Sequence, residues 1–322
     1  MSDTLKPKTH IAVIVPVYNS LKTLPELIDR LEATLSTITS DYQIVLIDDC
    51  GPQPVWPVIA MHAKRNPRIV GLRLSRNFGQ HAAITAGIKF ANSDWYVVMD
   101  CDLQDRPEDV ALLYQTAMSG NHDSVLAVRG DEDVGTRKKL GSRVFNFVLN
   151  KLADIPVSTD VGNYRIFNQD MAEAYRMYNE QMRLFPALMS HLGFDVGRVE
   201  VKRPARLEGK SGYSFSKLFE LAFDSIVSNT IKPVYYIATF GFLVALAAIL
   251  YTVILVVRKL VFGISAEGWA STMAAILMLG GIQILVTSFV GIYVGKVFFQ
   301  VKQRPSYILR ETTVDRIKAD MK

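Results

Sequence analysis

Short apolar runs alternate with amphipathic stretches over roughly the first 130 residues of this 322-residue chain. The runs predict buried β-strands and the stretches between them predict helices, because strands are short whereas helices show one polar face. Alternation of this kind indicates βαβ units and a mainly parallel sheet, which is an α/β fold. The predicted strands cover residues 11–17, 42–47, 69–74, 95–99 and 124–128.

Further along the chain the pattern predicts a helix over residues 140–152 and strands over 163–167 and 195–202. Between residues 217 and 231 the apolar positions gather on one helical side, which predicts an amphipathic helix. Two interpretations of this helix stay open: it lies on a membrane surface, or it packs against an ordinary protein core.

Two stretches near the C-terminus, residues 233–257 and 270–295, contain no charged residue. At 1.5 Å per residue, each spans roughly 38 Å as a helix, enough to cross a hydrocarbon core about 30 Å thick. Two buried helices of a soluble protein are the alternative, but globular helices of this length normally show a polar face. The sequence therefore predicts transmembrane helices over residues 232–257 and 270–296.

Basic residues are distributed unevenly around these two stretches. Arg258 and Lys259 lie in the connection, whereas seven Lys or Arg residues lie from residue 296 onwards. The positive-inside rule places the C-terminal tail in the cytoplasm, and a two-helix hairpin returns the chain to its starting side. We therefore expect a cytoplasmic domain over residues 1–214, the amphipathic helix over 215–231, the hairpin over 232–299 and a cytoplasmic tail over 300–322.

The net charge and the cysteine content indicate which binding partners and which cellular compartment suit this chain. The net charge of +5 is modest, and it suits anionic lipid headgroups and phosphate-bearing substrates; no nucleic-acid motif accompanies it. Cys50 and Cys101 fit a reducing compartment and show no metal-ligand spacing.

The segment Asp100-Cys101-Asp102-Leu103-Gln104-Asp105 directly follows a predicted buried strand. Because side chains alternate along an extended segment, Asp100 and Asp102 can point the same way and share one hard cation. Such a cation bridges the oxygens of a nucleotide diphosphate, which indicates a glycosyltransferase that uses a nucleotide-sugar. Aspartates are also common in surface turns, so the pair alone is a weak signal.

Polar residues also close the preceding strands, and in an open α/β sheet these strand ends face one crevice. A carboxylate there can bind a base or ribose hydroxyl, or it can simply cap a turn. The start of the next helix adds a cation and backbone donors. These candidate nucleotide-binding residues are Pro16, Tyr18, Asn19, Asp48, Asp49, Arg76, Asn77 and Gln80.

Two basic groups follow, one containing Arg129 and Arg137 and one containing Arg206 shortly before Ser211. Charge runs are usually solvated surface, but a lipid monophosphate acceptor would carry about −1.5 to −2 charges near pH 7 and would need cations beside a diphosphate donor. Because such an acceptor is already ionised, it needs little help from a general base.

These motifs, in this order and followed by the hairpin, resemble the polyprenyl-phosphate glycosyltransferases of family 2, which have the GT-A fold. The resemblance runs from Val15-Pro16-Val17-Tyr18-Asn19 to Gln303-Arg304-Pro305. It implies an inverting enzyme of the bacterial inner membrane that uses polyprenyl phosphate, and by analogy a homo-oligomer, often a tetramer. It also implies that Asp100, Asp102 and Gln104 hold Mg²⁺ or Mn²⁺.

The resemblance further implies that Arg129, Arg137 and Arg206, with Ser211, bind phosphates and that residues 160–165 lie near the acceptor. Asn163 stands where relatives often have an acid, which leaves Asp160 as the candidate base. A processive polysaccharide synthase and an inactive membrane scaffold are the competing interpretations. The chain lacks the Gln-x-x-Arg-Trp motif of the former, and its intact Asp100 and Asp102 argue against the latter.

Overall fold

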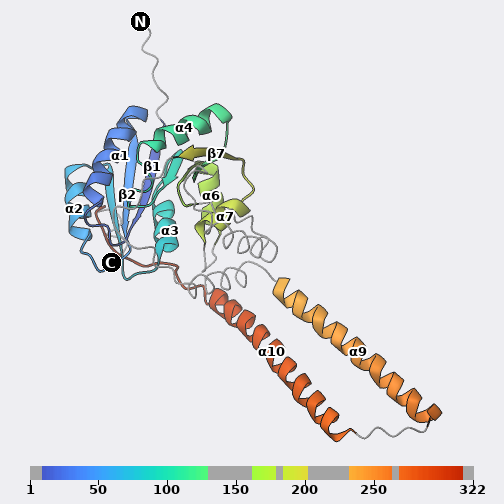
Figure 1. Ribbon diagram of the computed structural model, residues 1–322. Helices are drawn as coiled ribbons and strands as arrows, with labels where there is room; N and C mark the ends of the chain where they lie inside the picture. Colours follow the sequence, from blue (N-terminus) through green and yellow to red (C-terminus); the bar gives the residue numbers. More distant parts are fainter. Residues whose placement is uncertain (1–8, 130–161, 179–183, 202–231, 263–267, 315–322) are drawn as a thin grey trace. The chain divides into compact units, whose positions relative to one another are not determined.

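The computed structural model describes residues 9–129, 162–178, 184–201, 232–262 and 268–314 (Figure 1). These residues belong to two compact units. The first unit contains a β-sheet and its helices, together with the described residues from Arg304 onwards. The second unit contains two long apolar helices.

The first unit is built on a sheet with the strand order β7-β5-β6-β4-β1-β2-β3-β8. Its central strands β3, β2, β1 and β4 are parallel, whereas β6 and β8 are antiparallel to their neighbours. The strands are β1 (Ile11–Val17), β2 (Tyr42–Asp48), β3 (Ile69–Leu74), β4 (Trp95–Val98), β5 (Ser124–Arg129), β6 (Arg165–Asn168), β7 (Val196–Val201) and β8 (Leu309–Thr312).

The order of the central strands creates a topological switch point. From β1 the chain proceeds outward to β2 and β3, and then returns to the other side of β1 as β4. In an open α/β sheet, ligands bind at the carboxyl ends of the strands beside such a point. The predicted α/β fold with a mainly parallel central sheet is confirmed.

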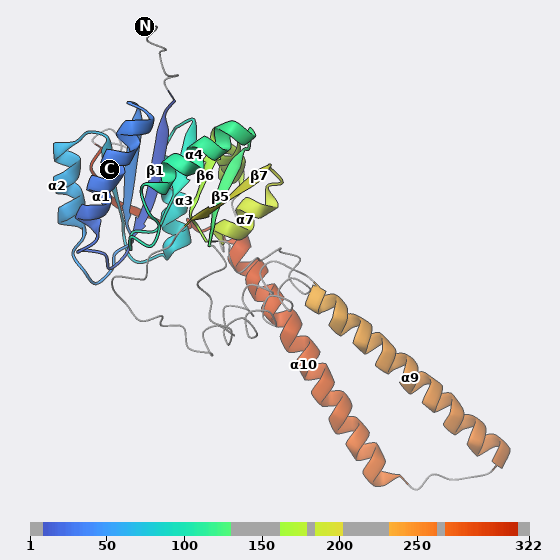
Figure 2. The ribbon, with the colours of Figure 1, turned by 45° about the horizontal axis from the view of Figure 1, so that its top comes forward.

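Helices cover both faces of the sheet (Figure 2). On one face lie α1 (Leu24–Ile38), α2 (Trp56–Arg65) and α4 (Asp109–Gly120); on the other lie α3 (Gln80–Phe90), α6 (Gln169–Met177) and α7 (Phe185–His191). In α1, for example, the buried residues Leu24, Leu27, Ile28, Leu31 and Leu35 recur at the spacing of one helical stripe.

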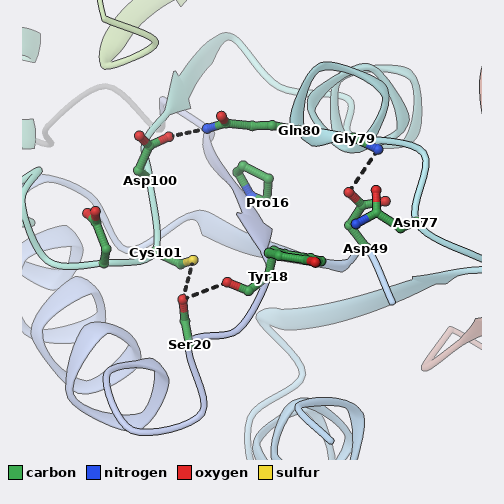
Figure 3. A pocket seen from close by; sticks show the side chains of 10 residues that line it. Pro16, Tyr18, Ser20, Asp49, Asn77, Gly79, Gln80, Asp100 and Cys101 are labelled. Atoms are coloured by element: carbon green, nitrogen blue, oxygen red, sulfur yellow. Dashed lines mark hydrogen bonds between the residues drawn. The ribbon is translucent and has the colours of Figure 1, made fainter. Parts of the chain in front are cut away.

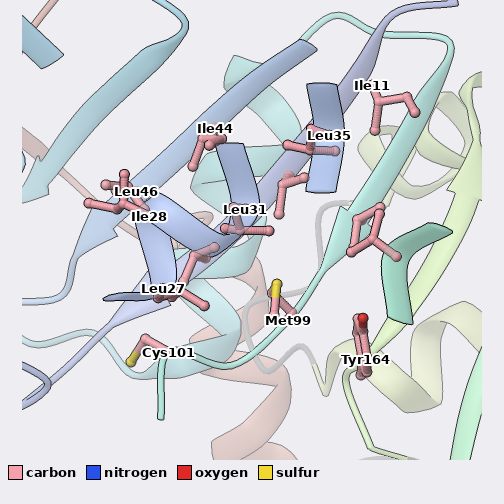
Figure 4. Close-up of a cluster of buried hydrophobic side chains, with 14 of the residues drawn as sticks. Ile11, Leu27, Ile28, Leu31, Leu35, Ile44, Leu46, Met99, Cys101 and Tyr164 are labelled. Carbon is pink, nitrogen blue, oxygen red and sulfur yellow. The ribbon is translucent and has the colours of Figure 1, made fainter. Parts of the chain in front are cut away.

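The central strands are buried on both faces because each face carries a helical layer. Alternate residues of β1 belong to two apolar clusters: Ile11 and Val13 pack with α1, whereas Ala12 and Ile14 pack with α3. Figure 4 shows part of the first cluster, between α1 and the sheet. The strand ends are therefore held by a close-packed interior.

Strand β8 was not expected from the sequence, which predicted only a tail over residues 300–322. It pairs antiparallel with β3, and Thr313 bonds to Gly71 through its backbone and its hydroxyl at 3.0 and 2.9 Å. Gly71 is required here, because a Cβ atom would come within 2.5 Å of Ile59. Four residues at a sheet edge carry too little periodicity to be recognised from sequence.

The second unit consists of α9 (Lys232–Phe262) and α10 (Trp269–Val301). Segments Val234–Tyr251 and Met278–Phe298 are long and apolar enough to cross a membrane, and neither is buried within the protein. Large exposed side chains such as Phe242, Leu246 and Ile284 lie on these helices. The predicted helices over 140–152 and 215–231 lie outside the described residues.

Candidate active site

A cavity of about 340 Å³ opens at the carboxyl ends of β1, β2 and β4, beside the first turn of α3 (Figure 3). It therefore lies at the switch point between β1 and β4. Its lining residues come from the end of β1 and from the segments that follow β1, β2, β3 and β4: Pro16, Tyr18, Ser20, Asp49, Asn77, Gly79, Gln80, Asp100, Cys101 and Asp102.

The turn after β4 brings Asp100 and Asp102 into this lining. Asp105 is buried and its carboxylate accepts a hydrogen bond from the Asp100 backbone N–H at 3.0 Å. The Asp102 carboxylate accepts one from the Gln104 N–H at 3.1 Å. Between them Leu103 has a φ of 62° and a buried side chain, so packing holds the turn in a conformation that leucine rarely adopts.

A second set of bonds ties this turn to the loop after β1. The Ser20 hydroxyl lies 2.9 Å from the Cys101 sulfur and donates to the Tyr18 carbonyl at 3.1 Å. Thr23 donates to the Cys101 carbonyl at 2.9 Å. Burial raises the pKa of the Cys101 thiol, which keeps it protonated at neutral pH. Cys101 therefore fixes the two aspartates relative to the first loop.

Asp49 organises the opposite wall. One carboxylate oxygen accepts from the Phe78 N–H at 2.8 Å and the other from the Gly79 N–H at 3.0 Å. Burial raises the pKa of the Asp49 carboxyl, and these two hydrogen bonds oppose the rise. Gly79 has a φ of 92°, a left-handed conformation that favours glycine. Asp49 thus positions the loop that carries Asn77 and begins α3.

Two further side chains complete the chemistry of the cavity. Gln80, the first residue of α3, donates from its amide to the Asp100 carboxylate, as Figure 3 shows. The Tyr18 side chain is 47% exposed although it lies in the lining. An exposed ring in a cavity offers an apolar surface for a planar base, with a hydroxyl at its edge.

Most of the nucleotide-binding residues predicted from sequence come together here. Those in the cavity lining are Pro16, Tyr18, Asp49, Asn77, Gln80, Asp100 and Asp102. The sequence analysis did not select Ser20, Gly79 and Cys101, which also line it. Each stands within two residues of a predicted one, so their position after a strand was the available signal.

Asn19, Arg76 and Gln104 are not part of this lining. Asn19 accepts from the Gln53 N–H at 3.4 Å, and the Arg76 guanidinium lies 4.1 Å from the centre of the Phe78 ring. The bond of Gln104 to Asp102 uses its backbone, so a ligand role for its side chain stays a prediction.

Asp48 was predicted to face the nucleotide, but the structure does not bring it to the cavity lining. Its buried carboxylate lies 3.2 Å from the Arg73 guanidinium, which lies 3.0 Å from Glu311 of β8. It also accepts from the Cys50 N–H at 3.0 Å. Burial raises the pKa of the Asp48 carboxyl, against the opposing effects of Cys50 and Arg73. Asp48 joins the central sheet to its edge strand.

The predicted phosphate-binding residues fall largely beyond the described part of the chain. Arg129 is the last residue of β5, and its side chain is not described. Arg137, Asp160, Arg206 and Ser211 lie in segments outside the described residues. Their roles stay predictions.

The donor set fits a hard divalent cation that a substrate helps to bind. Among the described residues no group of three His, Cys, Asp or Glu side chains could hold a metal. Mg²⁺ sites of this type use one or two carboxylates, and substrate phosphates and water complete the octahedron. Asp100 and Asp102, placed in one cavity, supply those carboxylates.

A crevice with paired carboxylates at the switch point of a GT-A sheet is characteristic of nucleotide-sugar-dependent glycosyltransferases. The chain matches Glycosyl transferase family 2 over residues 12–176, just over half its length. It belongs to this family, and the predictions of family, GT-A fold and glycosyltransferase activity are confirmed.

Relatives extend the similarity over almost the whole chain. A "Putative glycosyltransferase CsbB" of Bacillus subtilis is 30% identical, covering 94% of this chain and 92% of its own. An "Undecaprenyl-phosphate 4-deoxy-4-formamido-L-arabinose transferase" of Photorhabdus laumondii is 29% identical over 95% and 94%. A "Bactoprenol glucosyl transferase" of Shigella phage SfII is 29% identical over 94% and 98%.

Solved structures show a more distant likeness. Glucosyl-3-phosphoglycerate synthase from Mycobacterium tuberculosis, in complex with phosphoglyceric acid, is 11% identical over 69% of this chain and 80% of its own, with a TM-score of 0.48.

Proposed function

We propose that this protein transfers a sugar from a nucleotide-sugar to a polyprenyl phosphate, with inversion, at the cytoplasmic face of a bacterial inner membrane. The observation that carries the proposal is the placement of Asp100 and Asp102 in one cavity at the switch point, in a chain that also has two membrane-length apolar helices. Relatives named for undecaprenyl phosphate and bactoprenol support the acceptor class.

On this proposal the cavity binds the nucleotide part of the donor. Tyr18 offers its ring to the base, and the loop held by Asp49 offers the Asn77 amide to the ribose or phosphates. Asp100 and Asp102 would hold Mg²⁺ or Mn²⁺, and the Gln80 amide, which donates to the Asp100 carboxylate, would orient it. When bound, the metal neutralises the diphosphate and stabilises the charge that develops on the departing nucleoside diphosphate.

The acceptor supplies its own nucleophile. A phosphate monoester is already ionised near pH 7, so its oxygen can attack the anomeric carbon with little help from a general base. Arg129, Arg137 and Arg206, with Ser211, are proposed to bind its phosphate. Asp160 remains the candidate base if proton transfer is needed.

We propose that α9 and α10 cross the bilayer as a hairpin, because their apolar segments are long enough and seven basic residues lie from residue 296 onwards. Both chain ends would then lie in the cytoplasm, where nucleotide-sugars are made available. Homo-oligomer formation is proposed by analogy with the family alone.

The test is to incubate purified protein with polyprenyl phosphate and a panel of UDP-, GDP- and dTDP-sugars, and to separate the lipid products. We expect one sugar per lipid from one donor class. A growing polymer would favour the processive synthase, and no transfer from any donor would favour the scaffold.

The metal site is tested in the same assay with Asp102→Asn and with excess chelator. We expect each to lower transfer by about a thousandfold, because stabilisation of the leaving diphosphate is lost. Asp94→Asn is the matched control, since Asp94 directly precedes β4, at its opposite end, and bonds to the His10 N–H. Full activity of Asp102→Asn, or full activity in chelator, would refute the metal role.

A further inference from the structure

The guanidinium of Arg165 is buried on the face of the sheet that α3 covers, and the first turn of α3 lies beside the cavity. Arg165 is the first residue of β6 and stands opposite Val98, the last residue of β4. Residues directly opposite each other on antiparallel strands point to the same face. Val98 belongs to the apolar cluster of α3, whereas Tyr164 points into the other cluster (Figure 4). Arg165 therefore lies on the α3 face, and its partner Val98 precedes Asp100 by two residues.

The described part of the chain offers little compensation for the charge of Arg165. The side chain is 2% exposed. One terminal nitrogen donates to the Gly162 carbonyl at a long 3.4 Å, and the guanidinium lies 5.2 Å from the centre of the Phe185 ring. Its Nε has no hydrogen-bond partner among the described residues, and no described carboxylate forms an ion pair with it.

Burial lowers the pKa of the Arg165 guanidinium to about 10, which still leaves it charged at neutral pH. A buried charge without an ionic partner is costly for stability, because no opposite charge offsets the loss of its hydration.

Arg176 on the same face shows how a structural arginine is bound. It lies in the last turn of α6 and donates to the Ile88 carbonyl at 2.8 Å, to the Ala91 carbonyl at 2.6 Å and to the Tyr96 hydroxyl at 2.7 Å. These bonds close the C-terminal end of α3, away from the cavity. The two arginines share a residue type and a sheet face but differ in their partners and in the end of the sheet they occupy.

We propose that Arg165 supplies a fixed, buried positive charge that favours a nucleoside diphosphate in the cavity through the protein interior, without touching it. The inference rests on the proposed function, which places a diphosphate beside Asp100 and Asp102. Two carboxylates, one divalent cation and a nucleotide-sugar diphosphate together remain net negative. As the bond between the anomeric carbon and the diphosphate breaks, its electron pair leaves with the diphosphate while the acceptor oxygen forms the new bond.

The size of the effect follows from the distance and the medium. Arg165 does not line the cavity, so we take about 10 Å as the separation between its guanidinium and the diphosphate. At an effective dielectric constant of about 20, one pair of unit charges at that distance changes a binding constant about tenfold. Because the guanidinium is buried, salt screens this attraction less than it screens surface charges.

The experiment compares Arg165→Met with Arg176→Met, measuring the melting temperature and the binding of UDP, GDP or dTDP with Mn²⁺. For Arg165→Met we expect an unchanged or higher melting temperature, because a buried charge is replaced by an apolar side chain of similar length. We expect about tenfold weaker binding of the nucleoside diphosphate and unchanged binding of the uncharged nucleoside. Arg165→Lys keeps the charge and should retain most of the diphosphate affinity.

For Arg176→Met we expect the opposite pattern, a lower melting temperature with normal nucleoside diphosphate affinity. The inference is overturned if Arg165→Met is destabilised or unfolded like a structural variant, if it weakens nucleoside and nucleoside diphosphate equally, or if only the KM for lipid phosphate changes. Unchanged diphosphate binding by Arg165→Met overturns this inference alone. A wild-type protein that binds none of the three nucleoside diphosphates overturns the proposed function as well.

Discussion

Asp48 and Asp49 are adjacent, both are buried, and they serve different parts of the protein. Asp49 lines the cavity and holds the Phe78–Gly79 backbone with both carboxylate oxygens. Asp48 faces Arg73, which also contacts Glu311 of the edge strand. Because successive side chains near a strand end point to opposite sides, one aspartate shapes the site while its neighbour joins two strands.

Gln80 and His81 repeat this division at the start of α3. Gln80 lines the cavity and donates to Asp100. His81 is half-buried, and its Nδ1 accepts from the Phe185 N–H at 3.4 Å, which requires a neutral ring. Burial lowers the pKa of the His81 imidazole. In both pairs, residue type does not separate a binding role from a structural one, whereas the direction of the side chain does.

Among variants of these two residue pairs, Asp49→Asn should differ most from wild type. Asparagine offers one acceptor oxygen where the carboxylate offers two, so one loop N–H loses its partner and faces an amide NH₂. Leaving such a group unsatisfied costs about 1–3 kcal/mol, which raises the KM for the nucleotide-sugar roughly tenfold to a hundredfold. Steady-state kinetics with varied donor measure this.

The acceptor serves as the internal control for Asp49→Asn, because the variant should leave the KM for polyprenyl phosphate near its wild-type value. A donor KM within about twofold of wild type corresponds to less free energy than one weak hydrogen bond contributes. That result would remove Asp49 from the nucleotide site.

Asp48→Asn should have a small effect, and this effect should change stability and not the donor KM. Asparagine has the shape of aspartate and can still accept from the Cys50 N–H. Removal of a desolvated charge offsets loss of the ion pair with Arg73, so we expect the free energy of unfolding to change by less than about 1 kcal/mol. Because the fold raises the pKa of Asp48, wild-type stability declines as pH rises through that pKa, and the variant should lack this decline. Thermal unfolding of both proteins across acidic pH measures this difference. A raised donor KM for Asp48→Asn would contradict the assignment of a structural role to Asp48 and a binding role to Asp49.

The smallest effect is the pH dependence contributed by His81. The fold lowers its pKa below the ordinary value of 6.5, so its contribution to stability is complete above pH 6.5 and is lost as pH falls below that value. His81→Gln should therefore lose less of its melting temperature than wild type on acidification. Parallel pH profiles of melting temperature for the two proteins would show that the fold does not keep the His81 ring neutral.

The sequence was most informative where a local pattern repeats. Periodicity identified the strands β1 to β5 and the two apolar helices, and the order of elements indicated the parallel sheet and its crevice. From that crevice came Asp100, Asp102, Asp49 and Gln80, all of which line the cavity. The sequence could not identify β8, because its four residues pair with a strand more than 230 positions earlier.

What the sequence alone determined was the set of elements and the residues that end them, because these depend on the spacing of apolar positions within one helix or strand. What the tertiary structure decided was which of two neighbouring side chains faces the cavity, how Cys101 and Ser20 join two loops, and that Arg165 lies buried with no ionic partner among the described residues. Each of these depends on what a distant segment places opposite a side chain, and local periodicity carries no information about that partner.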